Sequence, residues 1–133
     1  MSHENVEIVR AAFAAFEQGN LGALLESAAE DLITHRVEPD DAIYHGKEGF
    51  LQGTADWIEG FEDWTVTPRE FIDGGDSVLV RVHQKARGEQ SGVPVESNMW
   101  FVFEIRGRKI ARLSFHLREA GALEAAGLRE SGT

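Results

Sequence analysis

Few side chains in this sequence are of types that carry chemistry. The 133 residues include no cysteine, which excludes a thiolate nucleophile, a disulfide framework and a cysteine-based zinc site. The serines lack the context of a hydrolase nucleophile, and the glycines of the 74–75 and 88–92 segments form no phosphate-binding pattern. The five histidines show no metal-binding spacing, so we expect neither a metal nor another cofactor. Histidines therefore remain as candidates for proton exchange near neutral pH.

Length and charge limit the class of protein. With 42% hydrophobic and 27% charged residues, the composition is that of one globular domain spanning residues 1–133. The 13 Lys and Arg against 23 Asp and Glu give a net charge of −10, which repels nucleic acid and anionic membranes. The first residues lack the pattern of a signal peptide, and no apolar run reaches about 18 residues. We expect a cytoplasmic protein.

Helical periodicity marks the first half of the chain. Val6, Val9, Phe13 and Phe16 recur at spacings of three and four, which predicts an amphipathic helix. Asn20 follows as a candidate cap for a second, shorter helix. Residues 31–37 are a short strand candidate, and a third helix with apolar residues at helical spacing follows from about residue 50.

The second half alternates with a period of two. Strands are predicted over 64–72, 78–83, 95–105 and 112–117, with a weak last helix over 119–128. Pro68 favours an edge position or a bulge for the first of these strands. Three consecutive long strands indicate an antiparallel meander whose apolar face the helices must cover, so the fold class is α+β.

Parity within the strands assigns each side chain to one face. If the valines of the 78–82 strand face the helices, Gln84 does so too, and Ser97 shares that face with Met99 and Phe101. The opposite face would then carry Arg81, His83, Glu96, Asn98, Trp100, Val102, Glu104, Arg112, Ser114 and His116. Gln84 and Ser97 are thus the polar side chains that these strands offer to the helical side.

Four segments together resemble a known family. These are residues 4–10 (ENVEIVR), 44–49 (YHGKEG), 107–110 (GRKI) and 124–128 (EAAGL), and they resemble SnoaL-like proteins of the nuclear-transport-factor-2-like, ketosteroid-isomerase-like superfamily. The resemblance implies a conical α+β barrel, in which a curved antiparallel sheet wraps around three N-terminal helices and leaves a pocket. That superfamily includes isomerases, cyclases, hydrolases and dehydratases as well as non-catalytic proteins, so the fold alone does not assign a function.

Comparison with the ketosteroid isomerases of that superfamily places a candidate base on the first strand. The position of their base falls at His35, or at Arg36 if the register differs by one residue. Their oxyanion donors fall near Ala12 and Phe101, which are apolar, and each missing donor removes about 3–4 kcal/mol of stabilisation. Steroid isomerisation is therefore not expected. His35 is either a general base or a hydrogen-bonded strand histidine near the pocket mouth.

The predicted pocket is mostly hydrophobic with a few polar groups, which suits a small apolar molecule. Its candidate ligand-binding residues are Phe13, Phe16, Tyr44, Trp57, Gln84, Ser97, Met99 and Phe101. Two functions remain open. One is a binding protein without turnover, and the other is an isomerase, cyclase or hydratase that uses His35 on an oxygenated polyketide- or terpenoid-like metabolite.

Trp100 indicates a possible partner surface. An aromatic residue at the centre of a mixed-charge face is typical of an interface, and members of the superfamily often dimerise through this face. We therefore predict a homodimer with Trp100 near its axis, the alternative being that Trp100 packs under a loop of its own chain.

Overall fold

The computed structural model describes residues 2–128. Its first two elements are helices. Helix α1 spans Ser2–Glu17 and helix α2 spans Leu21–Glu26. The Asn20 side chain accepts a hydrogen bond of 3.1 Å from the backbone N–H of Ala23, which caps α2 as predicted. No helix among the described residues is long and apolar enough to cross a membrane.

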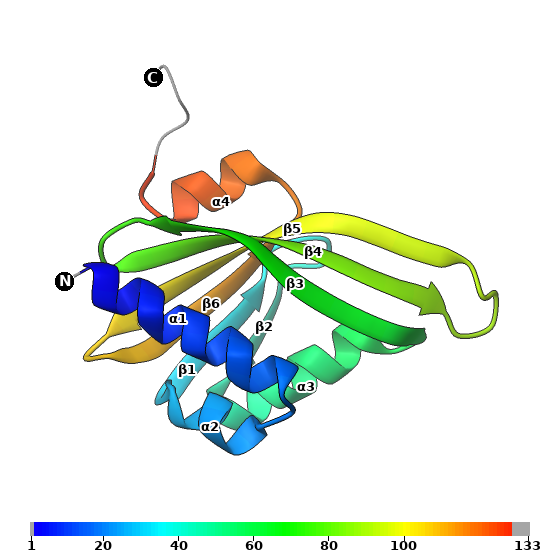
Figure 1. Ribbon diagram of the computed structural model, residues 1–133, viewed down its shortest axis with the longest axis horizontal. Helices are drawn as coiled ribbons and strands as arrows, with labels where there is room; N and C mark the ends of the chain where they lie inside the picture. The colour runs from blue at the N-terminus through cyan, green and yellow to red at the C-terminus, as the bar shows by residue number, and fades with distance from the viewer. Residues whose placement is uncertain (1, 129–133) are drawn as a thin grey trace.

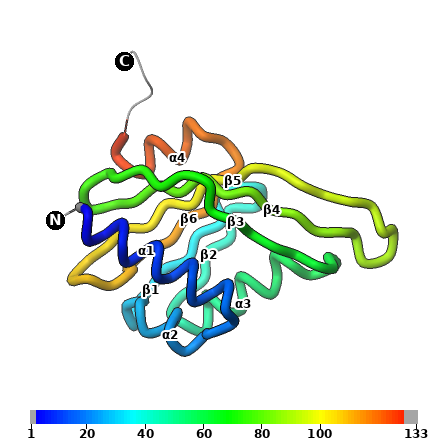
Figure 2. Tube along the Cα trace, viewed as in Figure 1, coloured from blue at the N-terminus to red at the C-terminus, as the bar shows by residue number. Residues whose placement is uncertain are grey.

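Six strands form one curved sheet, which is not closed into a barrel. They are β1 (Ala28–Arg36), β2 (Ala42–His45), β3 (Phe61–Asp73), β4 (Ser77–Gly88), β5 (Pro94–Arg106) and β6 (Lys109–His116). Their order across the sheet is β2-β1-β6-β5-β4-β3. All neighbours pair antiparallel except β1 and β6, which are parallel although they come from opposite ends of the chain (Figure 2). The predicted α+β fold is confirmed.

Helices cover both faces of this sheet. Figure 1 shows α1, α2 and α3 (Gly46–Ile58) on one side and α4 (Glu119–Ala125) on the other. The larger core lies between the sheet and the three leading helices, where Val9 and the valines of β4 are fully buried. The smaller core lies under α4 and contains Leu79, Val102, Ala122 and Ala126.

The predicted alternation of the long strands is confirmed. Val80 and Val82 pair with Phe101 and Met99 on the side of the leading helices, and Arg81 pairs with Trp100 on the other side. Strand β3 lies at the edge of the sheet, and its pairing with β4 shifts register just after Pro68. Both consequences of a proline in a strand are thus present in the structure.

The structure differs from the sequence prediction at several boundaries and in one strand. Helix α3 begins at Gly46 rather than near residue 50, β3 begins at Phe61 rather than at 64, β4 continues to Gly88 rather than ending at 83, and β6 begins at Lys109 rather than at 112. Strand β1 begins at Ala28 rather than at residue 31, because the main chain of residue 27 already bonds to Ile110 of β6. Strand β2 was not predicted, since four residues with half-buried and exposed positions in alternation carry little apolar signal. Helix α4 ends at Ala125 rather than at 128, with Ala126 as its C-cap.

Trp100 packs against a helix of its own chain. The side chain is half-buried and contacts the smaller core beneath α4, in which Leu79 and Val102 are fully buried. Its indole Nε1 is buried and has no hydrogen-bond partner. This packing explains why an aromatic residue lies at the centre of the outer face without requiring a second chain. The homodimer through Trp100 therefore remains a prediction.

His116 lies on the same outer face, and its burial should make the stability of the protein depend on pH. Its Nε2 atom is 2.9 Å from the Ser114 hydroxyl, and burial lowers the pKa of the imidazole below its ordinary value of 6.5. Below pH 6.5 the unfolded chain therefore binds a proton that the folded chain does not, so stability falls as the pH falls.

Replacing His116 with glutamine should remove this part of the pH dependence. We expect the decline in the free energy of unfolding below pH 6.5, measured by urea denaturation, to be shallower in His116→Gln than in the wild-type chain. The carboxyls of Glu38 and Asp40 have lowered pKa values, so their protonation reduces stability only below about pH 4.5, outside the range in which His116 contributes. Parallel curves for the two proteins between pH 7 and 5 would contradict the assignment.

Candidate functional site

An apolar cavity lies between the sheet and the three leading helices. Its volume is about 100 Å³, several times the space that one water molecule requires. The three leading helices and the strands β1, β3, β5 and β6 contribute to its wall. The lining residues are Ala12, Phe13, Phe16, Leu24, Leu25, Ser27, Ala28, Leu32, Arg36, Phe50, Gly53, Thr54, Trp57, Trp64, Val66, Met99, Phe101, Phe103, Ile110, Leu113 and Phe115. Arg36 is the only one of these lining residues with an ionisable side chain.

Aromatic rings make up much of this wall. Phe13 stacks on Phe101 with ring centroids 6.1 Å apart, and Phe115 meets Phe101 edge-on at 4.6 Å. Phe16 contacts Trp64 edge-on at 5.9 Å. Such pairs hold the rings in fixed relative orientations, so the wall presents flat apolar surfaces.

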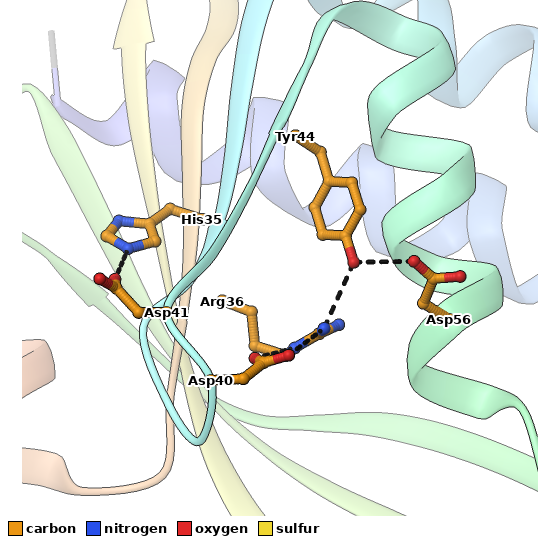
Figure 3. Close-up of polar contacts among 6 residues, drawn as sticks. All are labelled: His35, Arg36, Asp40, Asp41, Tyr44 and Asp56. Atoms are coloured by element: carbon orange, nitrogen blue, oxygen red, sulfur yellow. Dashed lines mark hydrogen bonds and ion pairs between the residues drawn. The ribbon is translucent and has the colours of Figure 1, made fainter.

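Strand β1 places Arg36, rather than His35, in the cavity. Leu32 and Arg36 are both buried lining residues, four positions apart on the same face of the strand. Successive strand residues point to opposite faces, and Figure 3 shows the His35 and Arg36 side chains leaving β1 on opposite sides. Of the two positions left open by the sequence, Arg36 is the one that lines the pocket.

His35 is part of a polar cluster on the outer face. Its Nε2 lies 2.5 Å from an oxygen of Asp41, and Arg112 of β6 donates to its Nδ1 over 2.9 Å. Because Nδ1 accepts, the proton of the neutral ring lies on Nε2, which donates to Asp41. Both ring nitrogens are engaged away from the cavity, so the expected placement of His35 at the pocket is corrected.

Arg36 is held by a carboxylate and two aromatic rings. Its Nε and Nη2 atoms each donate to a different oxygen of Asp40 over 2.8 Å, a bidentate ion pair. The guanidinium carbon lies 5.6 Å from the ring centre of Trp57 and 5.7 Å from that of Tyr44. The Arg36 side chain is 10% exposed and that of Asp40 is 53% exposed, which indicates that the cavity approaches solvent at this end.

This pairing keeps both groups charged. The hydrogen bonds from Arg36 hold the pKa of Asp40 below its ordinary value, and the bond to Asp40 raises that of Arg36 in spite of burial. Arg36 Nη2 also donates to the Tyr44 hydroxyl over 3.3 Å, and Tyr44 donates to Asp56 over 2.8 Å. The bond to Asp56 raises the pKa of the phenol, which stays protonated at neutral pH. We call Arg36, Asp40, Tyr44 and Asp56 the polar end of the cavity.

Two glycines of α3 give Tyr44 its position. An added Cβ at Gly53 would lie 2.9 Å from the Tyr44 ring, and one at Gly49 would lie 3.0 Å from the Tyr44 backbone. Real Cβ atoms essentially never approach as closely as the first distance, and the second is tighter than nine in ten real Cβ contacts. The tyrosine therefore lies close against α3 because both positions lack a side chain.

Gly53→Ala should therefore destabilise the protein although alanine favours helices. The higher helix propensity of alanine stabilises the protein by about 1 kcal/mol, whereas overpacking of its methyl group against the Tyr44 ring destabilises the protein by about 1–3 kcal/mol. In a Tyr44→Ala background the same change should instead stabilise the protein by up to about 1 kcal/mol. The free energies of unfolding of the four proteins form a double-mutant cycle that measures this coupling. Gly22→Ala, where the nearest atom is 3.8 Å away, is the control and should not destabilise.

Gln84 joins the two tryptophans of the wall. Its Oε1 accepts from the indole N–H of Trp57 on α3 and from that of Trp64 on β3, both over 3.0 Å. Its Nε2 donates to the Ser97 hydroxyl of β5 over 3.0 Å. One buried amide on β4 thus fixes two large lining rings, which come from the consecutive elements α3 and β3.

The predicted ligand-binding residues divide into two groups. Phe13, Phe16, Trp57, Met99 and Phe101 line the cavity. Tyr44, Gln84 and Ser97 do not line it but bond to lining residues, directly or through Gln84.

The sequence reading missed Trp64, Asp40 and Asp56. Trp64 is the first residue of a predicted strand, and its place in the wall depends on a contact between β3 and α1, in which its ring meets that of Phe16. Asp40 lies four residues after Arg36 in the segment Glu38-Pro39-Asp40-Asp41, whose composition favours a turn, and that spacing is the only signal for their pairing. Among the described residues, no group of three or more histidine or carboxylate side chains is arranged to hold a metal ion.

Comparisons with known proteins agree with this architecture. The family model for the SnoaL-like domain matches residues 9–113. Among curated proteins, none matches the chain. An NTF2-like protein of unknown function from Burkholderia pseudomallei superposes with a TM-score of 0.75 at 18% identity, over 91% of this chain and 95% of that one.

Two further solved structures are similar. TerC, co-crystallised with polyporic acid, superposes with a TM-score of 0.75 at 19% identity, over 93% of this chain and 98% of TerC. A proposed polyketide cyclase from Sinorhizobium meliloti gives a TM-score of 0.66 at 27% identity, over 87% of this chain and 99% of that one. At 18–19% identity, the likeness to the first protein and to TerC shows the shared fold alone.

Proposed function

The chain belongs to the SnoaL-like domain family, and we propose that it binds a small, largely apolar molecule in the cavity between the sheet and the three leading helices. The observation that carries this proposal is the composition of the wall, in which one buried guanidinium stands among apolar and aromatic side chains. Binding sites for small molecules combine such apolar walls with a few fixed polar groups. The co-crystal of TerC with polyporic acid supports a ring-containing ligand in this fold.

Binding without turnover is the function that the cavity supports best. A cyclase, isomerase or hydratase needs a group that accepts or donates a proton close to the ligand. Arg36, the only ionisable side chain in the wall, does not release its proton at neutral pH. The His35 nitrogens are engaged on the other face, so the geometry does not support His35 as the base of such an enzyme.

The three tryptophans allow a direct test. Trp57 and Trp64 line the cavity and donate their indole N–H groups to Gln84, whereas the N–H group of Trp100 is buried on the outer face. In a titration with acetophenone followed by ¹H–¹⁵N NMR, we expect the signals of Trp57 and Trp64 to shift while that of Trp100 stays in place. Absence of any shift with millimolar acetophenone, or a shift confined to Trp100, would refute the proposal.

Turnover can be examined in the same samples. After incubation with a panel of aromatic ketones, phenols and quinones, mass spectrometry should recover each compound unchanged. Protein-dependent conversion of any of them would contradict a purely binding role.

A further inference from the structure

Only one nitrogen of the Arg36 guanidinium, Nη1, is available to bond to a ligand. Nε and Nη2 are occupied by Asp40, and Nη2 is shared with Tyr44. The remaining nitrogen, Nη1, has no hydrogen-bond partner within residues 2–128. Because a guanidinium is planar, Nη1 points away from the edge that binds Asp40. A molecule in the cavity can therefore accept a hydrogen bond from Nη1, but it cannot form the two-point contact that a carboxylate makes with a free arginine.

The charge at the polar end also disfavours anions. The positive charge of Arg36 is matched by Asp40, and Asp56 adds a second negative charge through Tyr44. The two oxygens of Asp56 accept from Tyr44 and from Gln52 over 2.8 and 2.7 Å, and no arginine or lysine of the part of the chain that the structure describes forms an ion pair with it. A carboxylate entering the cavity would lose its hydration and meet a polar end whose net charge is negative.

The wall around Arg36 selects for shape. Trp57 faces the guanidinium, while Phe115 and Phe101 form an edge-to-face pair on the sheet side. Flat aromatic surfaces bind planar rings well, and the modest cavity limits the ligand to a small ring system.

From these contacts we propose that the cavity selects neutral, planar molecules with one hydrogen-bond acceptor, such as aryl ketones, over carboxylates of the same size. The acceptor oxygen bonds to Nη1 of Arg36, and the ring lies among Trp57, Phe101 and Phe115. This inference rests on the proposed binding function and adds the chemical class of the ligand.

Three probes of nearly equal size separate the possibilities. Acetophenone carries a neutral acceptor, α-methylstyrene replaces the carbonyl oxygen with a CH₂ group, and benzoate carries a carboxylate. Affinities are obtained from the shifts of the Trp57 and Trp64 indole signals. We expect acetophenone to bind about tenfold more tightly than α-methylstyrene, as for one hydrogen bond to a charged donor, and at least tenfold more tightly than benzoate.

Asp40→Asn tests why the carboxylate is rejected. This change frees the positive charge of Arg36, and we expect the affinity for benzoate to rise at least tenfold while that for α-methylstyrene is unchanged. Asp41→Asn is the matched control, because Asp41 is the neighbouring residue but bonds to His35 on the other face. It should leave the order of the three probes as in the wild-type chain.

The outcomes distinguish the ligand class from the binding function. If acetophenone binds no more tightly than α-methylstyrene or benzoate, the inferred ligand class is overturned and the binding function stands. The same holds if Asp40→Asn leaves benzoate binding unchanged. If none of the three probes shifts the Trp57 and Trp64 signals, the binding function itself is overturned.

Discussion

Replacing Ala12 with phenylalanine is expected to weaken binding of acetophenone at least 100-fold while the protein remains folded. Ala12 lies on α1, is 4% exposed and forms part of the cavity wall. A phenyl group at this position would occupy the space that the ligand uses, and its burial against the neighbouring rings offsets part of the strain of insertion. Affinity is measured by the NMR titration, and folding by circular dichroism and thermal denaturation.

Ala14→Phe is the matched control, since it places the same ring on the same helix at an exposed position. This variant should bind acetophenone as the wild-type chain does. If Ala12→Phe retained wild-type affinity while folded, the ligand would have to bind outside the cavity, and the proposed site would be wrong.

Leu79→Ala should cost about 2–5 kcal/mol of the free energy of unfolding, the largest loss of stability that we expect from a single truncation. Leu79 is fully buried, and it lies at the centre of the smaller core beneath α4. Truncation leaves a void between the sheet and the helix, because Val102 and Ala122 are held by the backbone and cannot fill it. Urea denaturation followed by fluorescence gives the difference.

Leu51→Ala provides the comparison, because Leu51 is 38% exposed on α3. There the same truncation should change the free energy of unfolding by less than about 1 kcal/mol. Similar losses for Leu79→Ala and Leu51→Ala would show that the layer under α4 contributes little to stability.

Much of the sheet could be predicted from its sequence. The pairing of β4 with β5 has no register shift, so the faces of Val80, Gln84 and Phe101 followed from parity alone. The edge position of β3 followed from Pro68. By contrast, β2 has too few residues to carry a pattern, and the Ala-Ala-Glu-Asp start of β1 is no more typical of a strand than of a helix.

The candidate site could be predicted only in part. The apolar wall was accessible, because residues such as Phe13 and Trp57 recur at helical spacing. The choice between His35 and Arg36 was not, since β1 shifts register against β6 between Ala28 and Ile33, and a shift of one residue exchanges the faces. A sequence also gives little reason to expect a buried arginine, because charged side chains are almost never buried without a partner. Asp40 becomes the partner of Arg36 only in the folded chain, where the turn after β1 places its carboxylate beside the guanidinium.

The parallel pairing of β1 with β6 has a consequence for synthesis of the chain. Arg36 is synthesised before β3, β4 and β5, but the strand beside it, with Phe115 opposite Arg36, is synthesised only after all three. Until β6 is present, no strand connects β1 and β2 to the rest of the sheet, and the cavity lacks the part of its wall that β6 supplies. A nascent chain that stops before residue 109 should therefore expose apolar surface and need chaperone protection, whatever the intrinsic stability of the finished domain.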